Sequence, residues 1–258
     1  DKYNIDIVVH AFSNKNDIEK QEEFFKIPIL LNKFKIIDYN VGISTTNIIQ
    51  NINNIENNNN NKKDWDLIWE LKGNNNDTNP FNLNGYENTT FNPNLIFQDI
   101  VKKFNLKKND KICEFGCGSG LISQYFNTHY DYYGIDYSES LILKNIKLFK
   151  SKVYNCEARD TPFKDKYFDY SFCICLFEYL KDKEYSKKVI EEMERVTKKG
   201  IYLINIRKKT HTQKQTKHKF EGVFTHLIFN EDEDLFKDFT LCDASYEKDK
   251  RFSVYREL

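Results

Sequence analysis

The sequence predicts an α/β fold with a mostly parallel sheet, helices on both faces and a C-terminal antiparallel hairpin. Three observations support this prediction. Short apolar segments alternate with segments of helical periodicity from about residue 93 onward, which is the pattern of strands joined by crossover helices. A glycine-rich turn at 116–120 stands between the first of these strands and a helix. Two strand-like segments, 240–247 and 251–257, follow one another near the last residue.

The individual elements follow from apolar periodicity and from turn residues. Strands alternate with helices along most of the chain, and Ser138 and Gly200 are the expected N-cap and C-cap of two of the helices. The predicted strands are 111–115, 132–136, 153–158, 170–175 and 201–206. The predicted helices are 93–104, 121–126, 138–149, 184–199 and 231–239.

The chain divides into three parts by composition. Residues 51–63 are mostly asparagine and predict a linker, because such a tract buries too little apolar surface to order itself. Residues 1–50 contain strand-like segments at 5–9 and 34–39 around a helical segment, and we expect an accessory segment or the tail of an upstream domain. Residues 64–258 are expected to form the main domain.

Composition also narrows the possible partners. The 39 basic and 39 acidic residues cancel, so the chain lacks the overall positive charge expected of a dedicated nucleic-acid-binding protein. No run of about 18 apolar residues occurs, so we expect no membrane partner. The start at Asp1 has no apolar segment like that of a signal peptide, which predicts a piece of a longer, multidomain chain.

The six cysteines predict a reducing compartment and no metal site. Four of them, Cys113, Cys156, Cys173 and Cys175, stand in apolar segments, where a free cysteine behaves as a small hydrophobic residue. Their spacing is not that of a zinc site, and a chain of this size does not need a disulfide framework. We therefore expect a cytoplasmic protein.

The glycine-rich turn suggests which kind of ligand the domain binds. A dinucleotide-binding turn has glycines at its first, third and sixth positions, but the sixth position here is Leu121. The acidic residue Glu114 stands just before Gly116, where a carboxylate would repel a pyrophosphate. The same carboxylate would favour the ammonium of a methionine group, directly or through water. The turn therefore predicts a cationic cofactor that bears an amino acid.

Two acidic residues after later strands are further ligand candidates. Asp136 ends the second strand, where a carboxylate can accept both hydroxyls of a ribose, and the alternative of a helix cap is weakened because Ser138 can supply that cap. Glu157 follows the third strand and could accept the adenine amino group, with an amide of Ala158 or Arg159 on the ring nitrogen. A solvated loop is the alternative for that segment, and Asp160 is a competing acid.

These motifs together resemble those of class I S-adenosylmethionine-dependent methyltransferases. The run 114–120 resembles their first motif, and 157–163 with 167–169 is similar to a signature of small-molecule members such as quinone-biosynthesis methyltransferases. The run 194–200 is similar to a turn that follows one of their helices. The resemblance covers 93–206 well, with departures at Glu157, Thr161 and Lys199, which leave the exact adenine contact open.

The resemblance implies a Rossmann-like seven-stranded sheet, S-adenosyl-L-methionine as the cofactor and transfer of its methyl group to a small molecule. We expect the acceptor atom to be an oxygen of a sugar, a nucleotide-linked sugar or another metabolite. It also implies that the segment 175–179 lies near the methionine end of the cofactor and the acceptor. The implied cofactor-binding residues are Glu114, Gly116, Cys117, Gly118, Gly120, Asp136, Tyr137, Glu157, Ala158, Arg159 and Cys175.

A base is needed only if the acceptor must lose a proton, and two residues are candidates. Glu178 follows the fourth strand, and His226 is flanked by apolar residues that predict a partly buried position. His211 and His218 are weaker candidates, because a histidine in a polar loop is more often solvated. The aromatic residues Trp65 and Trp69 before the first core helix predict either a lid over the site or ordinary packing.

The basic segment 207–219 leaves alternatives open. It could hold an anionic acceptor, or it could be a solvated loop. A second interpretation is an RNA or protein methyltransferase that uses this segment, although we expect no nucleic-acid partner from the overall charge. A third is a non-catalytic cofactor-binding module of a larger protein.

Overall fold

The computed structural model describes residues 65–87, 89–209, 226–244 and 246–258, apart from the side chains of 66 and 67, and the backbone of 8–11, 34–37, 216–217 and 223–224. The chain forms two compact units, Asp1–Asn61 and Lys62–Leu258. In the first unit, β1 (Val8–Ala11) pairs in parallel with β2 (Phe34–Ile37), within or beside the two segments predicted to be strands. The predicted helix before β2 and the asparagine-rich linker up to residue 61 lie outside the described residues.

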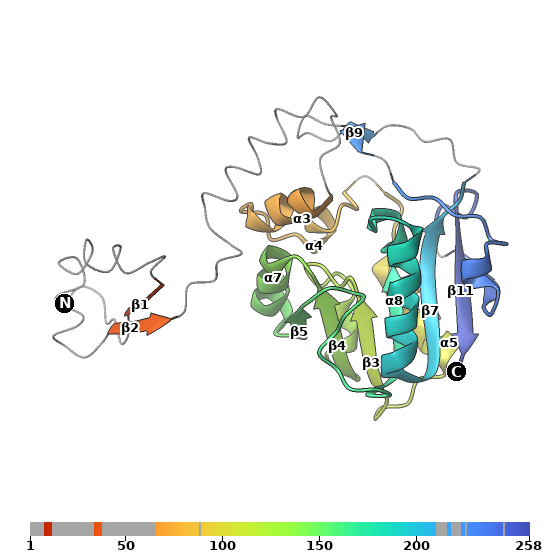
Figure 1. The fold of residues 1–258 in the computed structure, drawn as a ribbon, viewed down its shortest axis with the longest axis horizontal. Helices are drawn as coiled ribbons and strands as arrows, with labels where there is room; N and C mark the ends of the chain where they lie inside the picture. The colour runs from red at the N-terminus through yellow and green to blue at the C-terminus, as the bar shows by residue number, and fades with distance from the viewer. Residues whose placement is uncertain are drawn as a thin grey trace. The chain divides into compact units, whose positions relative to one another are not determined.

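The second unit is built on a seven-stranded sheet (Figure 1). Its strands are β3 (Lys111–Phe115), β4 (Asp131–Asp136), β5 (Lys152–Asn155), β6 (Phe168–Ile174), β7 (Thr197–Arg207), β10 (Thr240–Asp243) and β11 (Arg251–Glu257). They lie in the order β10-β11-β7-β6-β3-β4-β5, and β11 runs antiparallel to both of its neighbours while the others are parallel. The predicted fold class, including the closing hairpin, is confirmed.

The strand order reverses beside β3, and this places a ligand crevice. The chain moves outward from β3 to β4 and β5, then returns to β6 on the other side of β3. Glu114, near the carboxyl end of β3, therefore lies between Gly134 of β4 and Phe172 of β6. In open α/β sheets, the carboxyl ends of the strands at such a reversal form the ligand-binding crevice.

Helices cover both faces of the sheet and produce two cores (Figure 1). Alternate residues of β3 point to opposite faces, so Cys113 and Phe115 belong to one core and Ile112 to the other. The first core is covered by α8 and the second by α5 and α6. The helices are α3 (Trp65–Asn74), α4 (Pro80–Leu83), α5 (Pro93–Phe104), α6 (Ser123–Phe126), α7 (Glu139–Phe149) and α8 (Lys183–Val196), with short 3₁₀ helices η1 (Phe177–Tyr179) and η2 (Asp234–Phe236).

Local capping explains why two helices begin where the sequence predicts. The Asn92 side chain accepts hydrogen bonds from the amides of Asn94 and Leu95, and Pro93 occupies the first helical position of α5. The Ser138 side chain accepts from the Leu141 amide at the start of α7. Among the described residues, none of the helices has both the length and the apolar surface that a membrane-spanning segment needs.

Three predicted elements differ from the structure. The segment 231–239 forms only the short η2 instead of a helix, and its apolar residues Leu235, Phe236 and Phe239 pack against the first core without a regular helix. Gly200 does not cap α8, because that helix ends at Val196 and Thr197 already pairs with Phe168 as the first residue of β7. The strand β5 ends at Asn155, which leaves Cys156 in a loop.

Candidate active site

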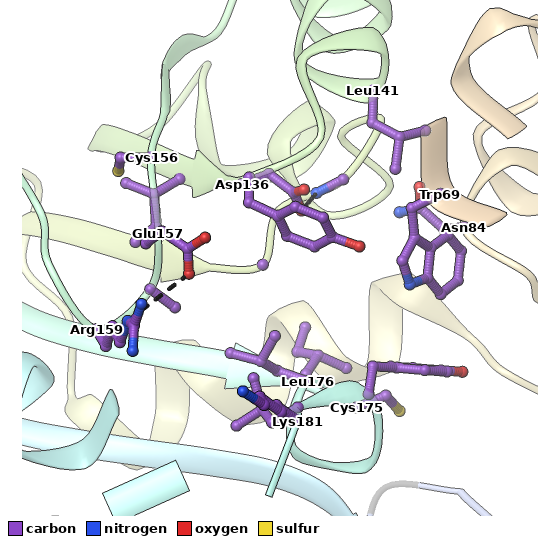
Figure 2. Close-up of a pocket in the computed structure, with 18 of the residues that line it drawn as sticks. Trp69, Asn84, Asp136, Leu141, Cys156, Glu157, Arg159, Cys175, Leu176 and Lys181 are labelled. Carbon is purple, nitrogen blue, oxygen red and sulfur yellow. Dashed lines mark hydrogen bonds and ion pairs between the residues drawn. The ribbon is translucent and has the colours of Figure 1, made fainter. Parts of the chain in front are cut away.

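A cavity lies at the carboxyl ends of β3, β4 and β6 (Figure 2). Eight of the eleven residues predicted to bind the cofactor line it: Gly116, Gly118, Asp136, Tyr137, Glu157, Ala158, Arg159 and Cys175. The other three, Glu114, Cys117 and Gly120, belong to the strand and turn beneath it but are not part of its lining. The fold therefore brings most of the predicted residues together from four separate segments of the chain.

The glycine turn is shaped by backbone hydrogen bonds to the neighbouring strand. The amides of Gly116 and Cys117 both donate to the carbonyl oxygen of Ile135, at 2.8 and 2.9 Å. Gly118 has a φ of +49°, and a Cβ atom there would lie 2.8 Å from the Asn84 side-chain oxygen. A side chain at Gly118 would therefore clash with this neighbour, which explains why glycine is required at this position.

Asp136 connects the glycine turn to α7. Its carboxylate accepts hydrogen bonds from the Gly118 amide at 2.8 Å and from the Ser138 amide at 2.9 Å. Desolvation raises the pKa of Asp136 to about 6, although both amides oppose that shift by stabilising the charged form. Each carboxylate oxygen accepts one of these two bonds and has a further lone pair, so the side chain can also accept hydrogen bonds from a ligand.

Glu114 differs from the sequence interpretation. Its side chain is buried, accepts a hydrogen bond from the Tyr132 hydroxyl and does not line the cavity. Burial raises the pKa of Glu114 to about 8, so the carboxyl group is protonated at neutral pH. Burial therefore leaves Glu114 uncharged, although the Tyr132 hydroxyl opposes this shift, and the residue would not repel a pyrophosphate as its sequence position suggested.

A third segment forms the opposite end of the cavity. The hydroxyl of Tyr185, in the first turns of α8, donates a hydrogen bond to the Glu157 carboxylate. The Arg159 guanidinium lies 4.8 Å from the centre of the Tyr185 ring, and its Nε is 4.0 Å from a Glu157 oxygen. Tyr185 lines the cavity but was not predicted from the sequence, since nothing in its helix distinguishes it from a packing residue.

The segment before the core covers another side of the cavity. Trp69 of α3, and Asn84 and Tyr86 after α4, all line it. The Asn84 side-chain oxygen accepts hydrogen bonds from the Ser119 amide at 3.0 Å and the Ser119 hydroxyl at 2.7 Å, which fixes this segment to the glycine turn. We call residues 65–91 the cap. Of the two alternatives predicted for its tryptophans, Trp69 borders the cavity and Trp65 packs behind it.

The geometry does not favour Glu178 as a base. It is 1% exposed, accepts from Arg207 Nε and from Arg251 Nη1 at 3.0 Å, and does not line the cavity. Burial alone would raise the pKa of Glu178, but the two arginines bring it below its ordinary value, so the group is a poor proton acceptor. Its carboxylate instead anchors η1 to β7 and β11.

His226 has the partly buried position that its neighbours predict, but it lies outside the lining of the cavity. Its ring centre is 4.7 Å from that of Trp65 and 5.4 Å from that of Tyr179. His211 and His218 lie outside the described residues. Among the described residues, no group of three possible metal ligands comes together.

Comparison with known proteins agrees with this arrangement. Residues 113–205 match the sequence profile of the methyltransferase domain family. This segment runs from β3 to β7 and is similar to the domains of class I, Rossmann-like methyltransferases. No curated protein matches the chain in sequence.

Solved structures show the same fold as this methyltransferase domain. A protein from Pyrococcus horikoshii is 18% identical over 64% of this chain and 88% of its own, with a TM-score of 0.52. Magnesium protoporphyrin IX methyltransferase from Synechocystis, with S-adenosylhomocysteine bound, is 15% identical over 64% and 80%, with a TM-score of 0.50. The matched part of this chain spans 54% of the length of a candidate S-adenosylmethionine-dependent methyltransferase from Methanococcus maripaludis. At such identities the likeness concerns the fold alone.

Proposed function

We propose that this domain transfers a methyl group to an oxygen atom of a small molecule, such as a sugar, a nucleotide-linked sugar or another metabolite. The observation that supports a small acceptor is the cap. Trp69 and Tyr86 border the cavity from above the glycine turn, and Asn84 fixes the cap to that turn. A substrate has to fit beneath these residues, which suits a small molecule better than a folded macromolecule.

The cofactor fits the residues around the cavity. Asp136 is positioned to accept the ribose hydroxyls, because its oxygens retain lone pairs beside the cavity. Glu157, Ala158 and Arg159 would hold the adenine, and the glycine turn would hold the methionine part close to the backbone. The Gly118 position supports this assignment, since it has no room for a side chain.

When bound, S-adenosyl-L-methionine supplies a methyl group on a positively charged sulfur. The protein then has to hold the acceptor oxygen in line with that methyl group and to exclude water. Among the described residues that line the cavity, the only carboxylates are Asp136 and Glu157, both assigned to the cofactor, and there is no histidine. We therefore infer that the domain acts mainly by positioning the acceptor. The acceptor oxygen would lose its proton without a carboxylate or imidazole of the protein acting as the base.

The second candidate is an RNA or protein methyltransferase that uses the basic segment 207–219. Two of its cations are already paired, since Arg207 binds Glu178 and the Lys208 Nζ lies 2.7 Å from a Glu231 oxygen. Residues 210–215 and 218–219 lie outside the described residues. The described part of this segment gives a macromolecular acceptor little support.

Two measurements test the proposal. Titration calorimetry should detect S-adenosylhomocysteine binding, and Asp136→Ala should weaken it by about 1.5–3 kcal/mol, the range for hydrogen bonds to charged groups. Cell extract incubated with the protein and isotope-labelled methyl donor should then carry label in the small-molecule fraction. Label only in RNA or protein would contradict the small acceptor, and binding without any transfer would favour a non-catalytic module.

A further inference from the structure

The part of the cavity beneath the cap has aromatic walls. Three rings from separate segments line it: Trp69 from α3, Tyr86 from the residues after α4, and Tyr179 from η1. The ring centres of Trp69 and Tyr179 are 5.1 Å apart, and the ring planes stand at 88°. Figure 2 shows Trp69 toward one end of the cavity, and Glu157 and Arg159 toward the other. Trp69 is thus separated from the carboxylate assigned to the adenine.

These rings are held firmly by their own neighbours. Tyr86 stacks on Phe91, with ring centres 3.9 Å apart. Tyr179 is contacted on another side by Trp65, with ring centres 4.8 Å apart. Burial raises the pKa of both tyrosine hydroxyls well above the ordinary value, so both rings remain neutral. Trp69 and Tyr179 together form an uncharged aromatic corner.

One cation of the cavity is free to meet a ligand. Two positively charged residues line it, Arg159 and Lys181. Arg159 is engaged with Glu157 and the Tyr185 ring. Lys181, two residues after Tyr179, makes no hydrogen bond or ion pair with any residue in the described part of the chain. In Figure 2 it lies on the same side of the cavity as Leu176 and Cys175.

We propose that the methyl acceptor is a planar aromatic acid whose ring packs in the corner of Trp69 and Tyr179 and whose acid group binds Lys181. This inference rests on the proposed small-molecule function and selects among its acceptors. Aromatic pairs in edge or offset contact gain energy beyond that of the area they bury. An ammonium group that meets a carboxylate forms a strong, charge-assisted hydrogen bond.

The same residues disfavour a sugar acceptor. A sugar presents hydroxyl groups around its whole rim, and each needs a polar partner once it leaves water. Beneath the cap, most of the described lining is apolar or aromatic, namely Trp69, Cys175, Leu176, Leu180 and the tyrosine rings. Lys181 is the cation, and Asn84 is a polar residue whose side-chain oxygen is already bound to Ser119. An aromatic acid instead requires polar contacts mainly at its acid group and at the acceptor oxygen.

The test measures binding of three probes to the protein saturated with S-adenosylhomocysteine. The probes are 4-hydroxybenzoate, 4-hydroxybenzamide and trans-4-hydroxycyclohexanecarboxylate, which separate the charge from the flat ring. We expect 4-hydroxybenzoate to bind about tenfold more tightly than either of the others, which corresponds to one good contact in each comparison. Titration calorimetry gives all three dissociation constants.

Two variants assign the preferences to residues. Lys181→Gln should bring the benzoate-to-benzamide ratio close to one and leave the preference for a flat ring. Trp69→Leu should reduce the preference over the cyclohexane acid and leave the preference for charge. Lys187→Gln is the matched control. Lys187 follows Lys181 closely in the sequence and lies in α8, but its side chain is 62% exposed and does not line the cavity. It should change neither ratio.

The outcomes separate this inference from the proposed function. If S-adenosylhomocysteine binds but none of the probes does, or if the benzamide or the cyclohexane acid binds as well as the benzoate, the aromatic-acid acceptor is wrong and the methyltransferase proposal stands. The aromatic-acid proposal would also be wrong if Lys181→Gln and Lys187→Gln lowered the two affinity ratios by the same amount. Failure of S-adenosylhomocysteine to bind would overturn the proposed function itself.

Discussion

Two buried glutamates in different regions of this domain differ in charge: one is neutral and the other is negative. Glu114, in β3 beside β4, is 4% exposed, and Glu178, in η1 beside β7 and β11, is 1% exposed. Burial raises the pKa of Glu114 to about 8, although the hydrogen bond from the neutral Tyr132 hydroxyl opposes this shift. Glu178 lies between Arg207 and Arg251, and its pKa falls below the ordinary value.

Burial favours the neutral form of both carboxyl groups, and only the two positively charged partners of Glu178 overcome this effect. The difference in charge also divides the domain into two regions. The cofactor region around the glycine turn is held together by backbone amides and neutral hydroxyls, whereas the region behind the aromatic corner is held together by ion pairs. The two regions should therefore respond differently to mutation and to pH. The largest effect is expected from the loss of a buried ion pair, and the smallest from the titration of one carboxylate.

The largest effect should come from the ion-pair region. Arg251→Met removes one partner of Glu178 and the donor to the Asn205 carbonyl oxygen. Leaving these groups buried should lower the free energy of unfolding by about 3–5 kcal/mol, measured by urea denaturation. The control Arg256→Met, on the same strand, removes a half-exposed pair with Glu194 and should cost about 1 kcal/mol or less. Equal losses would contradict the comparison.

Glu114→Gln tests the neutral region. The folded-state pKa of about 8 lies above the unfolded value of 4.5, so the protonated group stabilises the fold at low pH and that stabilisation is lost between about pH 4.5 and 8. Relative to wild type, the glutamine variant should gain about 2–3 kcal/mol between pH 6 and pH 8, since the limiting slope is about 1.4 kcal/mol per pH unit. Denaturation at both pH values measures it. Glu191→Gln, on the exposed face of α8, should show no such gain.

A smaller effect is expected where the cap meets the glycine turn. Asn84→Leu leaves the amide and hydroxyl of Ser119 without their acceptor, which should lower the free energy of unfolding by about 1–1.5 kcal/mol. It should also weaken S-adenosylhomocysteine binding, because the turn loses a contact. Asn82→Leu breaks only a hydrogen bond to Asp77 within the cap and should leave cofactor affinity unchanged. Equal affinity in all three proteins would show that Asn84 does not position the turn.

The smallest effect concerns Asp136. With a pKa of about 6, this carboxylate becomes protonated as the pH falls, and its charged form is the better acceptor for ribose hydroxyls. Affinity for S-adenosylhomocysteine should therefore fall about fourfold from pH 7.5 to pH 5.5. Calorimetry at the two pH values tests this. Asp136→Asn should bind more weakly at pH 7.5 and show a flat profile, and a fourfold fall in the variant would assign the titration to another group.

The cofactor region was largely predictable because its signals are local. The strand 111–115, the glycine turn and the helix that follows all lie within sixteen residues, and Asp136 ends the strand that pairs next to β3. Each of these elements has its own turn or cap residue, so the local sequence signals and the tertiary contacts favour the same structure. The sequence therefore predicted the fold class and eight residues of the cavity.

The ion-pair region could not be predicted because its contacts are distant in sequence. Arg251 meets Glu178 across 73 positions, and Arg207 meets it across 29. No periodicity or motif links such pairs. The sequence consequently offered Glu178 as a base, when its two arginines make it a structural anchor. The neutral state of Glu114 was missed for a related reason, since it follows from burial in the folded domain.

The strand order also has a consequence for how the chain assembles. β10 is attached to the sheet only through β11, although it precedes β11 in the chain. During synthesis β10 therefore has no docking partner until Arg251–Glu257 has emerged and paired with β7. Until that moment, the apolar β7 presents an unpaired edge, a surface on which growing chains can aggregate.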